Sequence, residues 1–179
     1  MLLVVAATEP ELRGAAGAET LVCGIGPVES ASAVAAALAV RRPGALLHVG
    51  IAGCRDGSGL EPGELVIGSE SVYEDVDGPL VNSRVAPAAD LLARGREVLP
   101  DAHVLPIGTS ASVGGTAACD VEAMEGFGVL RAASLAGVPA LEVRAIANRI
   151  EEPDRTLWRF DDALDALAGA VAALVLRLG

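Results

Sequence analysis

Acidic side chains in two short segments of this sequence are the first candidates for chemistry. Glu9 and Glu11 follow an apolar run near the start of the chain, and Glu122 and Glu125 flank Met124 where another apolar run meets a helical segment. A carboxylate can accept a proton from an attacking water, and it can accept hydrogen bonds from two neighbouring hydroxyl groups. These residues therefore predict a pocket for a small molecule.

A third polar group follows the helical segment. Arg144 and Asn148 stand near the far end of an apolar run that reads as a strand. Open α/β sheets bind their ligands at the carboxyl ends of their strands. We therefore expect Asn148, whose amide offers both a donor and an acceptor, to share one pocket with Glu125.

Apolar runs alternate with helical patterns along the chain, and this alternation predicts the elements that position the polar residues. From residue 162 onward, Leu and Val recur at alternating three- and four-residue spacing, which predicts one apolar helix face. We expect a single α/β domain over residues 1–179 with a mainly parallel sheet. The predicted strands are 2–7, 19–23, 45–49, 64–71 and 103–107, and the predicted helices are 28–40, 86–99 and 162–178.

Glycine-rich segments follow two of the predicted strands. Gly24-Ile25-Gly26-Pro27 precedes a helix, and Gly50-Ile51-Ala52-Gly53 follows the strand 45–49. We predict both as turns that form a backbone-lined floor at the strand ends. The first segment lacks the third glycine of the dinucleotide fingerprint and the lysine of a P-loop.

The charge balance narrows the range of partners. The formal net charge is -11 and the sequence pI is about 4.5, which disfavours a nucleic-acid polymer or an anionic membrane surface as partner. Three Cys without paired spacing and two His give no metal-binding pattern. We expect buried free thiols in a reducing cytoplasm, and a solvated loop at the acidic segment 73–78.

Six motifs, taken in order, resemble those of the nucleoside phosphorylase and nucleosidase superfamily. The resemblance covers nearly the whole chain, and Glu-Pro-Asp-Arg (152–155) followed by Trp158 resembles the futalosine hydrolases within it. The motifs are Ala-Ala-Thr-Glu-Pro-Glu (6–11), Gly-Ile-Gly-Pro-Val (24–28), Val-Gly-Ile-Ala-Gly (49–53), Gly-Glu-Leu-Val (63–66), Met-Glu-Gly (124–126) and Glu-Val-Arg-Ala-Ile-Ala-Asn (142–148).

The resemblance implies a three-layer fold in which a twisted mixed, mainly parallel sheet is flanked by helices. It implies hydrolysis of a purine nucleoside, with water attacking the anomeric carbon of the ribose. A futalosine hydrolase releases hypoxanthine and leaves dehypoxanthine futalosine on a route to menaquinone. The resemblance implies no metal and no organic cofactor. It also predicts a cytoplasmic homo-oligomer, a dimer or tetramer, because a neighbouring subunit often completes the pocket in this superfamily.

The resemblance also carries roles for individual residues. Glu125 matches the carboxylate that accepts hydrogen bonds from both ribose hydroxyls, and Met124 matches the residue that packs on the ribose. Glu11 matches the carboxylate that activates the attacking water, while Glu9 in the same turn remains an alternative. The backbone expected to line the floor under this water belongs to Ile51, Ala52 and Gly53.

Asn148 departs from the superfamily pattern. Adenine-releasing nucleosidases carry Asp at this place, and that Asp protonates the base at N7. Hypoxanthine has a carbonyl where adenine has an amino group, and the NH₂ of Asn148 supplies the donor that this carbonyl needs. An amide is not a strong acid, so the leaving base would be stabilised by hydrogen bonding. The predicted catalytic residues are therefore Glu11 and Asn148.

A second departure concerns phosphate. Phosphorylases of the superfamily place an Arg and a Ser near the third strand to bind this anion, whereas the corresponding places here hold His48 and Ile51. This difference favours water over phosphate as the attacking group.

Several neighbouring side chains have open assignments. We expect Glu122 and Arg144 to orient or brace the site without acting on the substrate. Arg149 and Arg155 are candidates for the aromatic carboxylate of futalosine, with surface ion pairs as the alternative. Trp158 either packs over the pocket or anchors the last helix.

Two other functions remain in competition. One is a methylthioadenosine or adenosylhomocysteine nucleosidase, which Asn148 disfavours. The other is a nucleoside-binding protein without catalysis, which would keep Glu125 and the glycine segments and would not need Glu11.

Overall fold

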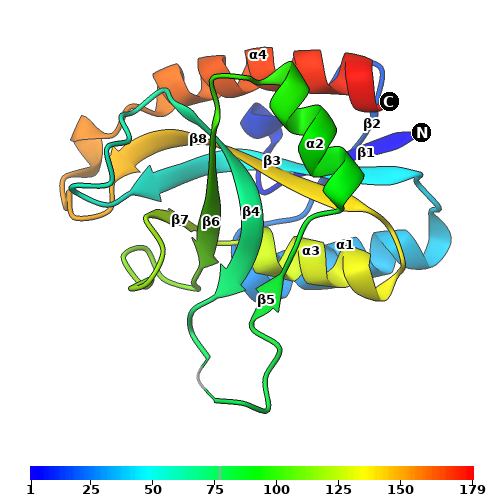
Figure 1. Cartoon of the computed structure of the whole chain (residues 1–179), viewed down its shortest axis with the longest axis horizontal. Coiled ribbons are helices and arrows are strands. Elements are labelled where there is room, and N and C mark those ends of the chain that lie inside the picture. Colours follow the sequence, from blue (N-terminus) through cyan, green and yellow to red (C-terminus); the bar gives the residue numbers. More distant parts are fainter. Residues whose placement is uncertain (77) are drawn as a thin grey trace.

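Helices cover both faces of a central sheet, and the three layers confirm the predicted α/β fold (Figure 1). The computed structural model describes residues 1–76 and 78–179. Helices α1 (Pro27–Val40) and α3 (Gly126–Leu135) pack together on one face of the sheet. Helices α2 (Ala89–Val98) and α4 (Phe160–Leu178) pack together on the other face.

The sheet is mixed and mainly parallel, as expected. Its strand order is β2-β1-β3-β7-β6-β4-β5, and β8 pairs with β3 in parallel and with β4 in antiparallel orientation. Strands β3, β7, β6, β4 and β8 therefore form a closed ring. The strands are β1 (Leu2–Ala6), β2 (Glu19–Val22), β3 (Ala45–Cys54), β4 (Leu65–Tyr73), β5 (Arg84–Val85), β6 (His103–Thr109), β7 (Val121–Ala123) and β8 (Ala140–Arg149).

Continuous apolar runs become the strands that are buried on both faces. All five residues of β1 are buried, and so are the first nine of β8. The predicted apolar face of α4 packs against β3 and β8 through Leu167, Val171 and Leu174. Small aliphatic side chains allow this close approach of helix to sheet.

The second glycine segment is not a turn, and that prediction was wrong. Strand β3 runs through residues 50–53 to Cys54 and pairs with β8 along this length. Gly50 serves close packing, because a Cβ there would lie 2.3 Å from the Arg144 Nη1 atom. The first segment does turn, and Gly24 and Gly26 have φ angles of 81° and 97° that favour glycine.

The acidic segment after β4 was predicted to be solvated, but two of its carboxylates bind a neighbouring loop. Glu74 accepts hydrogen bonds from the backbone N–H groups of residues 117–119 at 2.6 to 3.1 Å. Asp75 accepts from the Ser110 Oγ and the Ala111 N–H at 2.6 and 2.7 Å. Asp77 of this segment lies outside the described residues.

The cysteines confirm the expected buried free thiols. Cys23, Cys54 and Cys119 are all buried and unpaired with one another. Burial raises the pKa of Cys23 and of Cys119 to about 12, so both thiols stay protonated near neutral pH. In the part of the chain that the structure describes, no helix has the length and apolarity needed to cross a bilayer.

Candidate active site

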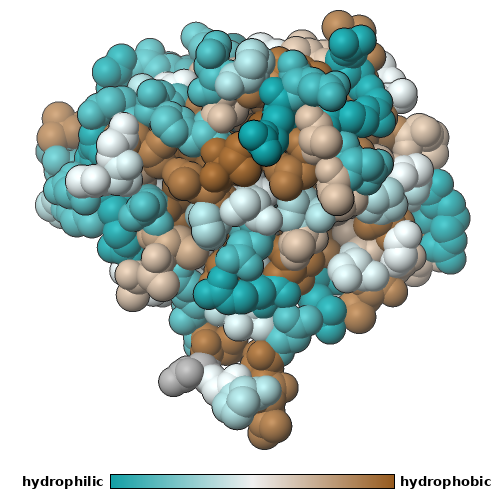
Figure 2. All heavy atoms as spheres, viewed as in Figure 1, coloured by the Kyte–Doolittle hydropathy of each residue, from teal (hydrophilic) through white to brown (hydrophobic). Residues whose placement is uncertain are grey.

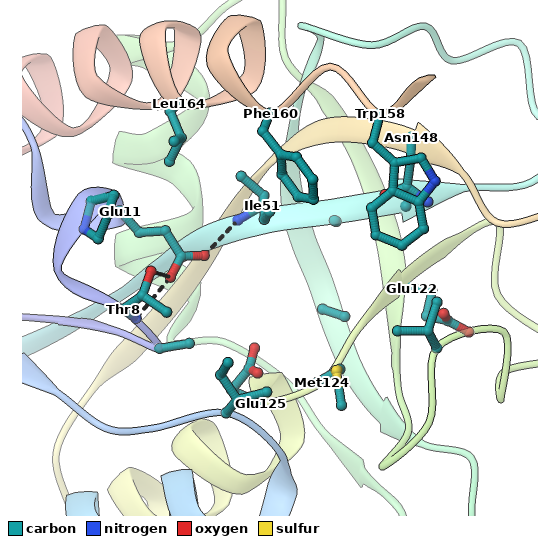
Figure 3. A pocket seen from close by; sticks show the side chains of 17 residues that line it. Thr8, Glu11, Ile51, Glu122, Met124, Glu125, Asn148, Trp158, Phe160 and Leu164 are labelled. Carbon is teal, nitrogen blue, oxygen red and sulfur yellow. Dashed lines mark hydrogen bonds between the residues drawn. The ribbon is translucent and has the colours of Figure 1, made fainter. Parts of the chain in front are cut away.

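A mostly apolar pocket of about 410 Å³ lies where β1, β3, β7 and β8 end (Figure 3). All seven residues predicted for the site line it. Figure 3 shows the carboxylates of Glu11 and Glu125 near one end of this pocket and Asn148 near the other. The structure thus brings together polar groups that are separated by more than a hundred residues in the sequence.

Glu11 is held with its carboxylate in the pocket by a short 3₁₀ helix, Glu9–Leu12, that follows β1. Its Oε2 accepts from the Thr8 N–H at 2.9 Å and from the Thr8 Oγ at 2.7 Å. Its Oε1 accepts from the Ile51 N–H at 3.0 Å. Glu9 is exposed and does not line the pocket, so of the two carboxylates of this turn only that of Glu11 lies there.

Glu125 stands at the junction of β7 and α3 and is 4% exposed. Its Oε1 accepts from the Gly26 N–H at 3.1 Å, and the Arg144 Nη1 donates to its Oε2 at 3.3 Å. The amino end of α1 thus binds the protein's own carboxylate. Burial raises the pKa of Glu125, while Arg144 and the Gly26 N–H lower it in part. Met124 lines the pocket beside Glu125.

The last residues of β3 pass along the pocket as strand rather than turn. Ile51, Ala52 and Gly53 all line it, and the pairing of β3 with β8 shifts register between Ala52 and Gly53. This shift sets Gly53 opposite Asn148, where a Cβ on the glycine would lie 3.0 Å from the Asn148 Nδ2. Glycine at this place therefore leaves room for the amide.

Asn148 is the penultimate residue of β8 and is 8% exposed. Its Nδ2 donates to the Arg149 carbonyl at 2.8 Å. The reversed amide would face this carbonyl with an oxygen, so the bond fixes which end of the side chain is NH₂. The second N–H and the Oδ1 remain for a ligand in the pocket.

Arg144 lies in the middle of β8, not near its end as predicted, and it is 1% exposed. The Arg144 Nε donates to Glu142 at 2.9 Å, and its Nη2 bonds the His48 Nε2 at 2.6 Å. Burial and the Arg144 guanidinium hold the pKa of His48 well below its usual value, so the imidazole is neutral. The sequence motif contained Glu142, but its place in this network was not predicted.

Glu122 lines the pocket and also organises the loop that follows β6. Its Oε1 accepts from the Gly114 N–H at 2.6 Å, and its Oε2 accepts from the N–H and the Oγ1 of Thr116 at 2.9 and 2.8 Å. The same loop places Val113 in the pocket wall. The contacts agree with the orienting role predicted for Glu122.

The pocket also contains apolar side chains from the last helix and the segment before it. Trp158, Phe160 and Leu164 line it, and the Trp158 and Phe160 rings lie 5.5 Å apart between centroids (Figure 3). The role of Trp158 had been left open, and Phe160 was not predicted. Aromatic residues make up only 2% of the chain. Two of them close together, just before and at the start of α4, were therefore the feature of the sequence that could have indicated an aromatic pocket wall.

The two arginines considered for the aromatic carboxylate differ in their contacts. Arg149 pairs with Glu61 at 2.6 Å and with Asp56 at 3.9 Å. The Arg155 guanidinium instead stacks over the ring of Trp158, 5.3 Å from its centroid. Neither guanidinium lines the pocket in this structure.

Comparison with known proteins gives matches along most of the chain. Residues 20–107 match the family model of the phosphorylase superfamily. Futalosine hydrolase of Streptomyces coelicolor is 32% identical over 190 residues, which cover 88% of this chain and 78% of that protein. Futalosine hydrolase of Acidothermus cellulolyticus is 34% identical over 158 residues, which cover 86% of this chain and 59% of that protein.

Solved structures with this fold include nucleosidases. The 5′-methylthioadenosine/S-adenosylhomocysteine nucleosidase of Streptococcus pneumoniae, with the transition-state inhibitor MT-ImmA, has a TM-score of 0.84 and 20% identity, and 99% of each chain is covered. A putative nucleosidase of this type from Borrelia burgdorferi, bound to adenine, has a TM-score of 0.84 and 16% identity, and all of each chain is covered. At these identities the likeness establishes the fold.

Proposed function

The chain belongs to the futalosine hydrolase family, and we propose that it hydrolyses the N-glycosidic bond of futalosine. The products are hypoxanthine and dehypoxanthine futalosine, on a route to menaquinone. The observation that carries this choice is Asn148, whose NH₂ orientation is fixed at a pocket that also contains the buried carboxylates of Glu11 and Glu125. A carbonyl on the purine requires this donor.

In the proposed reaction, the ribose passes through an oxocarbenium-like state while the purine leaves with the electrons of the glycosidic bond. Glu125 accepts hydrogen bonds from the ribose hydroxyls and Met124 packs on the sugar. Glu11 accepts one proton of the water that adds to the anomeric carbon, and the leaving purine anion takes up a proton from solvent to become hypoxanthine. A mostly apolar lining supports the exclusion of competing water, and it strengthens the attraction between the two carboxylates and the cationic sugar.

Water is the proposed attacking group because, among the described residues that line the pocket, there is no cationic side chain to bind phosphate. His48 is fully buried and neutral, and it bonds the Val5 carbonyl and Arg144. The Arg144 guanidinium is paired with Glu125 and Glu142. Ile51 presents an apolar side chain, and Glu11 and Glu125 repel an anion.

The direct test is incubation of the protein with futalosine, 5′-methylthioadenosine or inosine, with and without inorganic phosphate. Released base is followed by chromatography. We expect hypoxanthine from futalosine at a rate independent of phosphate. Release of adenine alone would favour the methylthioadenosine nucleosidase, a requirement for phosphate would favour phosphorolysis, and tight binding without release would favour a non-catalytic nucleoside-binding protein.

We also propose that the protein acts in the cytoplasm as a homo-oligomer, a dimer or tetramer. Support comes from the hairpin between β4 and β5, which projects from the body of the molecule and has apolar side chains at its tip (Figure 2). Leu80 is 98% exposed and Val81 is 46% exposed. Light scattering of the purified protein measures the assembly, and a monomer at all concentrations would contradict it.

A further inference from the structure

Glu142 is a carboxylate that is fully buried in β8 and does not line the pocket. Such a group requires partners, because a buried charge without them is unfavourable. Its Oε1 accepts from the Arg144 Nε at 2.9 Å, and its Oε2 accepts from the Ser71 Oγ. Both oxygens therefore take part in one network that leads toward the pocket.

The Arg144 guanidinium has a bonding partner at each nitrogen. The His48 Nδ1 lies 3.0 Å from the Val5 carbonyl, which can only accept, so the His48 Nε2 is free to accept from the Arg144 Nη2. Glu142 holds the Nε edge. With these two edges fixed, the remaining Nη1 is directed at the Glu125 carboxylate and the Ile51 carbonyl, each 3.3 Å away.

Two glycines provide the space for this network. A Cβ at Gly126 would lie 2.3 Å from the Glu142 Oε1, and a Cβ at Gly50 would lie 2.3 Å from the Arg144 Nη1. Gly126 begins α3 directly after Glu125. The glycine of the Met-Glu-Gly motif therefore allows the carboxylate of Glu142 to lie against the backbone that positions Glu125.

The groups around Glu125 differ in their charge. Arg144 is the guanidinium that faces the carboxylates of Glu125 and Glu142, and Glu11 also contributes to its field. Burial alone would lower the pKa of Arg144, but these carboxylates raise it, so Arg144 stays charged. His48 is neutral. Because Arg144 also pairs with Glu142, it donates only one hydrogen bond to Glu125, from its Nη1, so Glu125 keeps acceptor capacity on the pocket side.

We propose that Glu142 is a positioning residue for this hydrolysis, holding Arg144 so that the Glu125 carboxylate faces the ribose hydroxyls. This role rests on the proposed function. Without the Glu142 charge, Arg144 turns toward Glu125 and binds it with both ends of its fork. The hydroxyl-binding oxygens are then occupied, and a contact that strengthens in the transition state is lost.

The test measures kcat and KM for futalosine in wild type, Glu142→Gln, Arg144→Met and the double variant, together with the thermal midpoint of each. We expect Glu142→Gln to lower kcat on the order of 10-fold or more with little change in KM, as for an interaction made mainly in the transition state. In the Arg144→Met background, the same substitution has no further effect on kcat, because its route to Glu125 is gone.

Two further variants keep the proposal falsifiable. Glu70→Gln makes the same chemical change in an ion pair with Arg84 outside the pocket, and it leaves kcat unchanged. If Glu142→Gln fails to fold, Ser71→Ala removes one bond to Glu142, and we expect a smaller loss in kcat of the same kind. An unchanged kcat in Glu142→Gln, or in Ser71→Ala when that variant is needed, overturns the role.

Independent effects of Glu142→Gln and Arg144→Met that multiply in the double variant also overturn it. Wild-type protein that releases no base from futalosine, methylthioadenosine or inosine overturns the proposed function and this role together. An active wild type with an unaffected Glu142→Gln variant overturns the role of Glu142 alone.

Discussion

Replacing Asn148 with Asp tests how the pocket selects its base. In the native protein the Asn148 Nδ2 donates to the Arg149 carbonyl at 2.8 Å, which leaves one N–H for the ligand. Asp presents two oxygens of nearly the same shape. The oxygen that takes the place of the Nδ2 faces both the Arg149 carbonyl and the C6 carbonyl of hypoxanthine, so two donor–acceptor contacts become contacts between acceptors.

The size of the effect follows from burial. Asn148 is 8% exposed, so water replaces neither lost donor well. Leaving one buried acceptor unsatisfied costs about 1–3 kcal/mol, and the contact with the base is the one that differs between substrates. At about 1.4 kcal/mol for each factor of ten, we expect kcat/KM for futalosine to fall roughly 5- to 150-fold. The lost hydrogen bond to the Arg149 carbonyl also lowers the stability of the protein, and this effect is the same whichever substrate is used.

The assay compares kcat/KM for futalosine and for 5′-methylthioadenosine in wild type, Asn148→Asp and Asn148→Ala. Asn148→Ala removes the amide without adding a carboxylate, so it separates the lost donor from the added acceptor. Asn82→Asp is the control for the change in charge, since Asn82 is exposed on the hairpin between β4 and β5 and does not line the pocket. We expect the ratio of futalosine to methylthioadenosine turnover to fall only in the Asn148 variants, and furthest in Asn148→Asp.

One result would refute the reasoning. If Asn148→Asp turns over futalosine as fast as wild type or faster, the amide is not the group that reads the C6 carbonyl. A thermal midpoint close to that of the wild type shows that such a result concerns recognition and not the amount of folded protein.

Three other predictions follow from contacts in the same structure. Glu11→Gln lowers kcat by about 10²- to 10⁴-fold if this carboxylate takes the proton of water, while Glu9→Gln retains activity because its side chain is outside the pocket, and equal losses would contradict the choice between them. Leu174→Ala lowers the free energy of unfolding by about 2–5 kcal/mol in urea denaturation, whereas Leu176→Ala, 83% exposed in the native protein, changes it by less than about 0.5 kcal/mol. Gly50→Ala forces a Cβ to 2.3 Å from a buried guanidinium nitrogen, so we expect loss of both stability and activity, and full activity at an unchanged midpoint would contradict the close packing.

The elements with continuous apolar runs could be predicted because the residues of each run are enough to indicate that it is buried. Strands β1 and β8 are buried along nearly all of their length, and the spacing of Leu and Val in α4 matches the face that packs on the sheet. Such runs need no knowledge of their partners. The pocket residues could be predicted because they follow these runs, and the resemblance supplied their expected roles.

The glycines of β3 show where local patterns become ambiguous. Gly24 and Gly26 turn the chain with positive φ, whereas Gly50 and Gly53 stay in a strand and leave room for side chains of β8. Both uses place Gly after a predicted strand, so the sequence pattern was the same. Only the position of a guanidinium and an amide from a distant strand distinguishes them.

The charged network could not be predicted from the sequence, for a related reason. The spacing of Glu142 and Arg144 places both on one side of β8, and this much can be read from the sequence. Their partners Ser71 and His48 come from other strands. The apolar wall formed by Phe160 was likewise hidden, because it depends on where α4 begins relative to the pocket.

The arrangement of charge links these separate observations to the choice of water. Glu11 and Glu125 present two carboxylates at one end of a mostly apolar pocket, and the nearby His48 is neutral because of burial and the charge of Arg144. Arg144 lies behind the pocket wall, where it also forms an ion pair with Glu142. A cationic ribose is therefore attracted to this end of the pocket, while a phosphate anion meets two like charges. The network that holds Glu125 thus also favours hydrolysis over phosphorolysis.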